Sequence, residues 1–232
     1  MRTDVPPAVV AGLARQREVL GRALADGAVQ SGWKVGFGAP TAMAKLGLGA
    51  PVIGFLLASG ERPSGVPVGI GTFTRPVVEA EIAVWIGSDV PADTPVEAIG
   101  GFVSAVGPAI EIADVDHAPE DVERILAGNI FHHSYILGTP DSTCTLADAA
   151  TLTAVIEHAG DRLAVQHPAA LTGSLPDVLA QVARLAPLVS RGLRAGDVVL
   201  TGSIIVPRPV SAGDTFRCAL GGLPPITVQF TP

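Results

Sequence analysis

The sequence predicts an α+β fold in which strands dominate and two long helices pack beside them. Apolar residues alternate with polar ones over many short segments, as they do in strands, and Gly and Pro separate these segments. Helical spacing of apolar residues extends over two long segments, residues 7–28 and 175–191. Because the predicted strands are spread along the chain, their pairing must be long-range and the sheets mixed. No linker interrupts the chain, and we expect a single domain over residues 1–232.

The composition is that of a compact, turn-rich globular protein. Hydrophobic residues make up 48% of the chain and charged residues 16%, with 27 Gly and 20 Pro, which argues against disorder. The net charge of −7 leaves no basic surface, so we expect no nucleic-acid partner. The sequence has no signal-peptide core and no apolar run of about eighteen residues, so we expect no membrane association and a cytoplasmic location. Cys144 and Cys218 are too few for a disulfide framework and lack zinc-site spacing, which predicts free thiols.

The N-terminal part, about residues 1–60, is predicted to hold the first long helix and short strands. Pro6 and Pro7 fit the first turn of that helix, where a backbone amide hydrogen is not needed. The next segment, W-K-V-G-F, reads as a strand with Lys34 between apolar neighbours. The predicted elements are a helix from residue 7 to about 28, a strand over 33–37, a helix over 40–46 and a strand over 53–57.

The remainder, about residues 61–232, is predicted to be the strand-rich part of the chain. A loop rich in Gly and Pro over residues 59–71 leads into it and could border a site. Thr94 and Glu97 match a capping box that would open a short helix, and a second short helix begins near residue 119. Strands are predicted over residues 75–87, 102–114, 131–138, 151–157 and 162–166, and again through the C-terminal segments after the second long helix.

Two carboxylates share one face of the predicted strand over residues 75–87. Successive side chains of a strand point to opposite faces, which places Glu79 and Glu81 with Trp85 and leaves the other face wholly apolar. Like charges in a partly desolvated place raise each other's pKa unless a cation compensates them. A hard divalent metal with oxygen ligands is a suitable cation for this pair. The alternative is that both glutamates lie on the solvated face of an edge strand.

Four further polar side chains are candidates for a functional site. Glu111 lies late in an apolar strand, where a carboxylate needs a partner or a metal, unless it reaches solvent at the strand end. Lys34 could meet an anionic substrate group, but the residues alone favour a lysine that snorkels from a strand end. His132 and His133 are adjacent and so face opposite sides of their strand. One of them could line a pocket, although packed or surface histidines are the common case.

Six short segments carry a recognisable pattern along the chain. They are S-G-W-K-V-G-F (31–37), R-P-V-V-E-A-E-I-A (75–83), P-A-I-E-I-A-D (108–114), A-G-D-V-V-L-T-G-S (195–203), A-G-D-T-F (212–216) and L-G-G-L-P-P-I-T-V-Q-F (220–230). With these segments the chain resembles the fumarylacetoacetate hydrolase superfamily, and within it the 2-hydroxypenta-2,4-dienoate (2-keto-4-pentenoate) hydratases and 4-oxalocrotonate decarboxylases. The resemblance implies a β-rich mixed-sheet roll of the fumarylacetoacetate hydrolase C-terminal-domain type.

The resemblance assigns roles to particular residues. It implies that Glu79, Glu81 and Glu111 bind Mg²⁺ or Mn²⁺ and leave positions open for water and a chelating substrate. It implies that Lys34 lies near the substrate, where it would bind and neutralise the anion or shuttle a proton. Two hydroxyls would reach the substrate carboxylate, those of Thr201 and Ser203.

The implied activity is metal-assisted enolate chemistry on a small 2-oxo acid. A hydratase would protonate the dienolate at C5 and add water at C4, which converts a 2-hydroxy-2,4-dienoate to a 4-hydroxy-2-oxo acid in aromatic catabolism. The same chemistry serves decarboxylation of an oxalocrotonate-type acid or C–C hydrolysis of an acylpyruvate. A non-catalytic family member acting as a partner subunit or binding protein is a third reading. The resemblance also implies a homo-oligomer that could associate with a related enzyme of the same pathway.

The chain departs from the hydratase pattern over residues 127–131. Hydratases usually read A-D-N-A-S here, whereas this chain reads A-G-N-I-F. Gly128 replaces an aspartate, and bulky Ile130 and Phe131 replace small residues. We expect a more apolar pocket with altered proton-transfer groups.

A second departure lies at residues 50–55, which read A-P-V-I-G-F. The family often has an acid in this segment, where Val52 and Ile53 stand here. This change is expected to make the pocket more apolar as well. In a decarboxylase or hydrolase, His132 or His133 would then replace the missing acid–base group.

Overall fold

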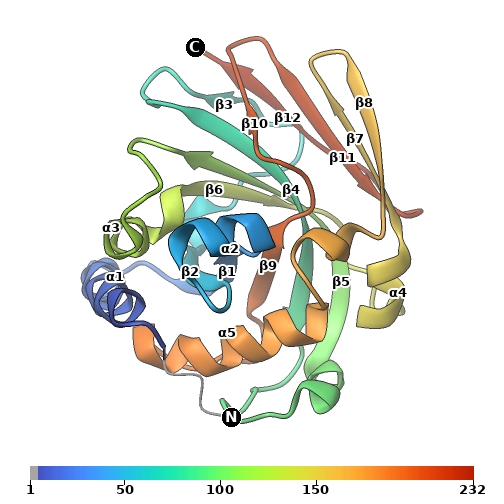
Figure 1. The fold of residues 1–232 in the computed structure, drawn as a ribbon. Coiled ribbons are helices and arrows are strands. Elements are labelled where there is room, and N and C mark those ends of the chain that lie inside the picture. Colours follow the sequence, from blue (N-terminus) through green and yellow to red (C-terminus); the bar gives the residue numbers. More distant parts are fainter. Residues whose placement is uncertain (1–4) are drawn as a thin grey trace.

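The computed structural model describes residues 5–232 and contains two β-sheets and two long helices (Figure 1). Residues 1–4, which the sequence places ahead of the first helix, lie outside the described residues. The helices are α1 (Pro7–Ala25), α2 (Pro40–Leu46), α3 (Val122–Ala127), α4 (Leu146–Thr151) and α5 (Leu175–Val189), with 3₁₀ turns at Ala58–Gly60, Val96–Phe102, Asn129–Phe131 and Pro168–Leu171. The strands are β1 (Gln30–Gly36), β2 (Val52–Leu57), β3 (Val68–Gly69), β4 (Pro76–Ile86), β5 (Val103–Asp114), β6 (His132–Leu137), β7 (Thr153–His158), β8 (Asp161–Gln166), β9 (Val198–Ser203), β10 (Arg208–Pro209), β11 (Thr215–Leu220) and β12 (Ile226–Thr231).

Both sheets are of mixed type, as predicted. The larger sheet has seven strands in the order β2-β1-β9-β4-β5-β6, with β10 paired to β4. Its β1 and β9 are parallel, and its other pairs are antiparallel. The smaller sheet has five strands in the order β3-β12-β11-β7-β8, of which β3 and β12 are parallel. Because β1 pairs with β9 across most of the chain, the fold depends on long-range pairing.

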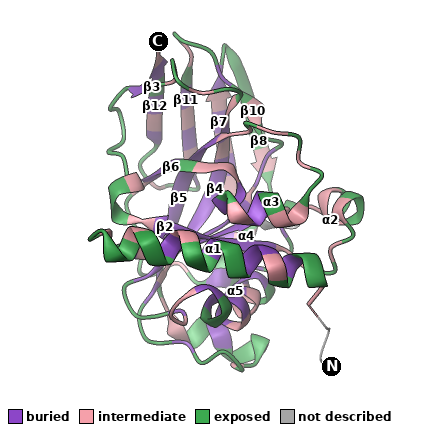
Figure 2. Ribbon diagram, turned by 90° about the vertical axis from the view of Figure 1, so that its left-hand side faces the viewer, coloured by how far each residue is buried: buried purple, intermediate pink, exposed green. Residues whose placement is uncertain are grey.

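The strand β4 crosses the middle of the larger sheet between β9 and β5 (Figure 1). Its predicted apolar face is at most 2% exposed and consists of Val78, Ala80, Ile82, Val84 and Ile86. Figure 2 shows the strand buried in the interior of the molecule. Since β4 is paired on both sides, the alternative of an edge strand for its two glutamates is wrong.

The helices α1 and α5 lie at the end of the molecule opposite to the smaller sheet (Figures 1 and 2). The Ser174 hydroxyl caps α5 by accepting a hydrogen bond from the Asp177 amide at 3.4 Å. In α1, Gly12 permits close packing on α3, because a Cβ there would lie 2.7 Å from the Leu126 Cβ. Both helices occur as predicted, and each ends two or three residues earlier than expected.

Two short helices differ from the prediction. The expected capping box of Thr94 and Glu97 does not form, because the Thr94 hydroxyl donates instead to the Pro91 carbonyl at 2.8 Å. The element that follows is a 3₁₀ helix without a side-chain cap. The helix α4 was not predicted, although Thr145 and Asp148 form a complete capping box at its start.

Neither Cys144 nor Cys218 forms a disulfide, as predicted. Cys218 is fully buried, which raises the pKa of its thiol to about 12 and leaves it unreactive. Among the helices of residues 5–232, none is both long enough and apolar enough to cross a membrane.

Candidate metal centre and substrate cavity

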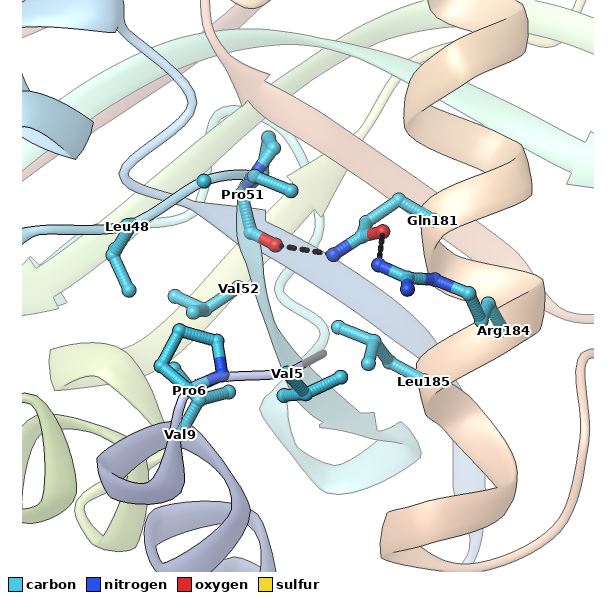
Figure 3. A pocket seen from close by; sticks show the side chains of 11 residues that line it. Val5, Pro6, Val9, Leu48, Pro51, Val52, Gln181, Arg184 and Leu185 are labelled. Carbon is cyan, nitrogen blue, oxygen red and sulfur yellow. Dashed lines mark hydrogen bonds between the residues drawn. The ribbon is translucent and has the colours of Figure 1, made fainter. Parts of the chain in front are cut away.

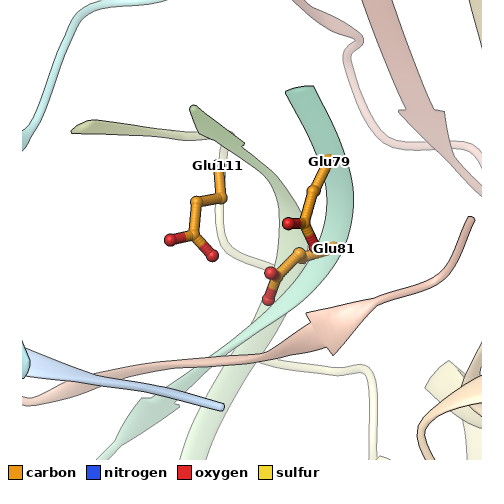
Figure 4. Close-up of side chains that lie close together, drawn as sticks. All are labelled: Glu79, Glu81 and Glu111. Atoms are coloured by element: carbon orange, nitrogen blue, oxygen red, sulfur yellow. The ribbon is translucent and has the colours of Figure 1, made fainter. Parts of the chain in front are cut away.

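The pairing of β4 with β5 brings the three predicted glutamates together. Glu79 lies directly opposite Glu111, and Glu81 is two residues further along β4. One carboxylate oxygen from each residue lies within 4.8 Å of the other two (Figure 4). This spacing suits three oxygen ligands around one divalent cation, since ligand distances are about 2.0–2.6 Å.

Two carboxylate oxygens of the cluster are buried and have no hydrogen-bond partner among residues 5–232. Glu81 is 1% exposed; its Oε2 accepts a hydrogen bond from the Gly202 amide at 2.8 Å, and its Oε1 has no partner. Glu111 is fully buried, and its Oε2 also lacks a partner. Because an unpaired buried carboxylate oxygen is costly, these residues fit a bound Mg²⁺ or Mn²⁺. The alternative in which Glu111 reaches solvent is wrong.

Lys34 brings a cation to this cluster from β1. Its side chain is 3% exposed, and Nζ donates to Glu111 Oε1 at 2.5 Å and to the Ile130 carbonyl at 3.3 Å. A snorkelling lysine would carry its ammonium to solvent, so that interpretation of Lys34 is wrong. Gly54 faces Lys34 from β2 and leaves room for it, because a Cβ there would lie 3.0 Å from Lys34 Cγ.

Burial and mutual repulsion shift the pKa values of the cluster. Burial, together with the charge of Glu111, raises the pKa of Glu79 to about 7. The same causes raise the pKa of Glu81 well above its ordinary value. Burial alone would also raise the pKa of Glu111, but Lys34 and His132 overcome it and lower this pKa to about 2. The carboxylates in turn overcome burial at Lys34 and raise its pKa, so the ammonium stays charged.

His132 contacts the cluster from the start of β6. Its Nδ1 lies 2.7 Å from Glu111 Oε1, and its side chain is 7% exposed. The register between β5 and β6 shifts by one residue at this point, and such bulges redirect side chains. His133 is exposed, and its ring lies 4.2 Å from that of Phe73. The two histidines therefore face different ways, and of the pair only His132 approaches the glutamates.

A cavity of about 430 Å³ opens beside Lys34 and Glu79. Ser203 lines this cavity, and its hydroxyl donates to a backbone carbonyl two residues further on at 2.8 Å. The structure does not bring Thr201 to the cavity, because that residue is fully buried and its hydroxyl donates to the Ile82 carbonyl at 3.0 Å. The register between β4 and β9 shifts at this position, and the Thr201 side chain points towards β4 instead of the cavity.

Thr172 is a cavity residue that the sequence did not reveal. It lines the cavity and is 6% exposed, and no described residue forms a hydrogen bond with its Oγ1. It packs against β9, since a Cβ on Gly202 would lie 3.1 Å from Thr172 Cγ2. Thr172 lies in the loop ahead of α5, and no spacing or periodicity connects it with the glutamates, so no sequence signal could have found it.

A left-handed turn over residues 129–131 forms one wall of the cavity. Asn129, Ile130 and Phe131 have φ values of 54°, 56° and 61°, a region that costs non-glycine residues about 1–2 kcal/mol each. The Asn129 side chain holds the turn, because its Oδ1 accepts from the Phe55 amide at 2.8 Å and its Nδ2 donates to the Phe55 carbonyl at 2.9 Å. Ile130 and Phe131 line the cavity and make it apolar, as their replacement of small residues predicts.

The second departure does not affect this cavity. Val52 and Ile53 are buried in the core, and neither lines it, so the expectation that they make the substrate pocket apolar is wrong. Val52 instead lines a separate cavity of about 170 Å³ between the start of α1 and α5 (Figure 3). There Gln181 donates to the Pro51 carbonyl at 2.9 Å, and no carboxylate of the described residues lines the space.

Comparison with known proteins extends these observations. The model of the fumarylacetoacetate (FAA) hydrolase C-terminal family matches residues 37–231. The chain is 32% identical over 214 residues to the TodF product hydratase of Pseudomonas putida strain F1, which covers 90% of this chain and 79% of that one. It is 29% identical over 204 residues to a 2-keto-4-pentenoate hydratase of Burkholderia vietnamiensis, with coverage of 86% and 78%. A solved 4-oxalocrotonate decarboxylase from Pseudomonas putida G7, complexed with magnesium and adipate, matches with a TM-score of 0.84 and 26% identity over 94% of this chain and 84% of that one.

These matches cover nearly the whole chain, and all three clustered glutamates lie inside the matched residues. The fold of this chain agrees with that of the matching solved structure. The chain therefore belongs to the fumarylacetoacetate hydrolase C-terminal family.

Proposed function

We propose that the protein is a metal-dependent hydratase that converts a 2-hydroxy-2,4-dienoate to a 4-hydroxy-2-oxo acid in the catabolism of aromatic compounds. The observation that carries this proposal is the pair of buried, unpartnered carboxylate oxygens on Glu81 and Glu111, beside Lys34 and an open cavity. Similarity to two proteins named as hydratases supports the reaction type.

The cation site consists of Glu79, Glu81 and Glu111, which would hold Mg²⁺ or Mn²⁺. When bound, that cation supplies a Lewis acid that stabilises negative charge on a chelating 2-oxo acid. Lys34 and His132 both occupy Oε1 of Glu111, so its Oε2 is left for the cation. Lys34 also compensates one of the three carboxylate charges. With a divalent ion bound, the net charge of the site is therefore near zero.

The cavity side chains bind and orient the substrate. The Lys34 ammonium places a fixed positive charge beside the substrate anion and is the proton donor for C5. The Thr172 hydroxyl, which has no hydrogen-bond partner among the described residues, is a donor for the substrate carboxylate. The Ser203 hydroxyl becomes a second donor when it gives up its hydrogen bond to the Ile205 carbonyl. In the overall reaction C5 and C3 each gain a hydrogen, C4 gains a hydroxyl and the 2-hydroxyl proton leaves, so one water is consumed.

The test is a spectroscopic assay of the purified protein with 2-hydroxypenta-2,4-dienoate and Mg²⁺, Mn²⁺ or a chelator. The dienoate absorbance should disappear with metal, persist with chelator and persist in Glu111→Gln. Glu97→Gln, an exposed glutamate outside the cluster, is the matched control and should retain activity. An unchanged dienoate under every metal condition would contradict the proposal.

A decarboxylase of an oxalocrotonate-type acid, or a C–C hydrolase of an acylpyruvate, is the second candidate. The contact of His132 with Glu111 favours it, as does the match to a solved decarboxylase. Release of carbon dioxide or of a pyruvate fragment from these acids would identify it. Metal binding without turnover of any of the three acids would instead favour a non-catalytic partner subunit or binding protein.

We also propose that the protein acts as a homo-oligomer in the cytoplasm. Large apolar side chains are exposed on the single chain, among them Val206 at 80% and Val29 at 65%, and such residues support a buried interface. Light scattering coupled to size-exclusion chromatography tests this, and a monomer at micromolar concentration would contradict it.

A further inference from the structure

The cavity beside the glutamates has a strongly apolar lining. Among the described residues that line it, Lys34 and Glu79 carry charge, and Lys34 is already paired with Glu111. Apolar side chains continue to the solvent, since Leu171 is 42% exposed and Val206 80% exposed while both line the cavity. A substrate whose acid head is bound at Lys34 and Glu79 must therefore extend along apolar surface.

The wall made by Ile130 and Phe131 is fixed in place. Ile130 is 4% exposed and presses against β1, because a Cβ on Gly36 would lie 2.7 Å from Ile130 Cγ2. The Phe131 ring packs on the His117 ring with centroids 4.7 Å apart. Strained left-handed residues persist only where the surroundings hold them firmly, as the Asn129 amide does here. Such a wall cannot easily move aside for a charged group.

Two further cations lie near the rim but do not line the cavity. Arg75 is exposed, and its Nε donates to the carbonyl of Val115, a lining residue, at 2.6 Å. Arg208 lies 3.6 Å from Asp161. Of the two, Arg75 is the cation with which a second substrate carboxylate would have to form an ion pair.

We propose that this cavity selects 2-oxo monoacids with an apolar tail and rejects 2-oxo diacids, and that Ile130 and Phe131 determine this specificity. The inference rests on the proposed function, because it assumes that the acid head binds at the glutamate cluster. A second carboxylate placed on this wall would lose water without gaining a cation, which is strongly unfavourable. Each methylene of an apolar tail, by contrast, leaves water for an apolar surface and should tighten binding about fourfold.

The experiment measures binding instead of turnover. Isothermal titration calorimetry of the Mg²⁺-loaded protein would compare pyruvate, 2-oxopentanoate, 2-oxohexanoate and 2-oxooctanoate with the diacid 2-oxohexanedioate. We expect affinity to rise along the monoacid series by about fourfold per methylene at first, and the diacid to bind at least about tenfold more weakly than 2-oxohexanoate. A flat series, or a diacid that binds as well as the monoacid, would overturn the inference.

These saturated acids are not dienoates, so their binding separates this inference from the hydratase proposal. The expected binding order without turnover of any dienoate would leave the inference standing and remove the hydratase. Turnover of the dienoate together with the reverse binding order would support the hydratase and remove the inference. Failure of every 2-oxo acid to bind would overturn the inference, and the hydratase proposal would still be decided by the dienoate assay.

Substitutions test whether the wall determines which 2-oxo acids bind. Phe131→Ser should lower affinity for 2-oxooctanoate at least about fivefold while pyruvate, which has no tail, binds unchanged and so reports an intact fold. Phe102→Ser makes the same change at a half-buried phenylalanine outside the cavity and should alter neither ligand. Arg75→Gln should also have no effect; a loss of diacid binding in this variant would show that the rim does recruit a second carboxylate and would contradict the proposal.

Discussion

The buried carboxylates of this site have different partners, and the partners set different charge states. Glu111 is held by Lys34 and His132, which stabilise its charged form. In the part of the chain that the structure describes, Glu81 has only the Gly202 amide as a donor, and burial makes its charged form unfavourable. Without a cation, the site therefore holds one stable carboxylate beside others that gain protons readily. A divalent metal would remove this difference in charge state, because it stabilises the deprotonated form of each carboxylate that it binds.

At Glu81, the substitution Glu81→Gln should separate metal binding from stability. Mn²⁺ affinity should fall at least about 100-fold because a charged ligand is lost. The metal-free protein should keep or raise its melting temperature, because a neutral amide avoids the cost of the buried charge. Calorimetric Mn²⁺ titration and thermal unfolding in chelator measure the two effects. A metal-free variant that melts well below the parent protein would contradict this view of Glu81.

At His132, the substitution His132→Phe should weaken metal binding without removing a ligand. The imidazole fixes the orientation of Glu111, and loss of such a partner typically costs about 10–100-fold in metal affinity. His133→Phe is the matched control, because that ring is exposed and contacts Phe73 instead of a glutamate. Equal effects of the two substitutions in a Mn²⁺ titration would argue against a positioning role for His132.

At the scale of elements, the turn over residues 129–131 joins α3 to β6 and shapes the cavity. Its carbonyl at Ile130 accepts a hydrogen bond from Lys34, so the same turn orients the lysine and forms the apolar wall. Asn129 is the residue that connects this turn with β2.

The substitution Asn129→Ala should destabilise the protein by about 2–4 kcal/mol, because it leaves the amide and carbonyl of buried Phe55 without partners. Urea unfolding of the metal-free protein measures this. Gln181→Ala removes half-buried hydrogen bonds to the Pro51 carbonyl and from the Arg184 side chain, whose groups can turn to water, and should cost only about 1 kcal/mol. A loss for Asn129→Ala no larger than that control would show that the turn is held by other contacts.

For the whole molecule, the shifted pKa values set how stability depends on pH. The pKa of Glu79 rises from 4.5 to about 7, and that of Glu81 rises as well, so between these pH values the folded protein binds more protons than the unfolded chain. Stability of the metal-free protein therefore falls as pH rises through this window. The lowered pKa of Glu111, about 2, acts in the opposite sense, and its contribution is lost as pH falls below 4.5.

Thermal unfolding in chelator should thus show a lower melting temperature at pH 8 than at pH 5.5. Saturating Mg²⁺ or Mn²⁺ should abolish or reverse this fall of the melting temperature with pH, because the cation binds the deprotonated carboxylates. At 100 times its Kd, a bound cation stabilises the fold by about 2.7 kcal/mol. Glu81→Gln should show a shallower slope in chelator and little response to metal. A melting temperature that rises with pH in chelator would contradict the assignment of raised pKa values to Glu79 and Glu81.

The sequence by itself determined which residues share a face or an element. Alternation of side chains is a local property of the backbone, so residues 75–87 were sufficient to place Glu79 and Glu81 together and to bury the opposite face. The two long helices follow from helical spacing for the same reason. The apolar strand around Glu111 made this residue a third candidate ligand, the similarity to a known family supported it, and the structure brings it opposite Glu79.

Only the tertiary structure decided which side chains from distant elements meet. Lys34 on β1 pairs with Glu111 on β5 although β9 and β4 lie between these strands, so no local pattern of the sequence could predict the contact. Thr201 turns away from the cavity, and Thr172 enters it from a loop. Strand register, bulges and left-handed turns are set by packing of the whole sheet, and a slip of one residue reverses the direction of every side chain. The proposed acid–base and substrate-binding groups depend on those directions, whereas the shared face of the glutamates does not.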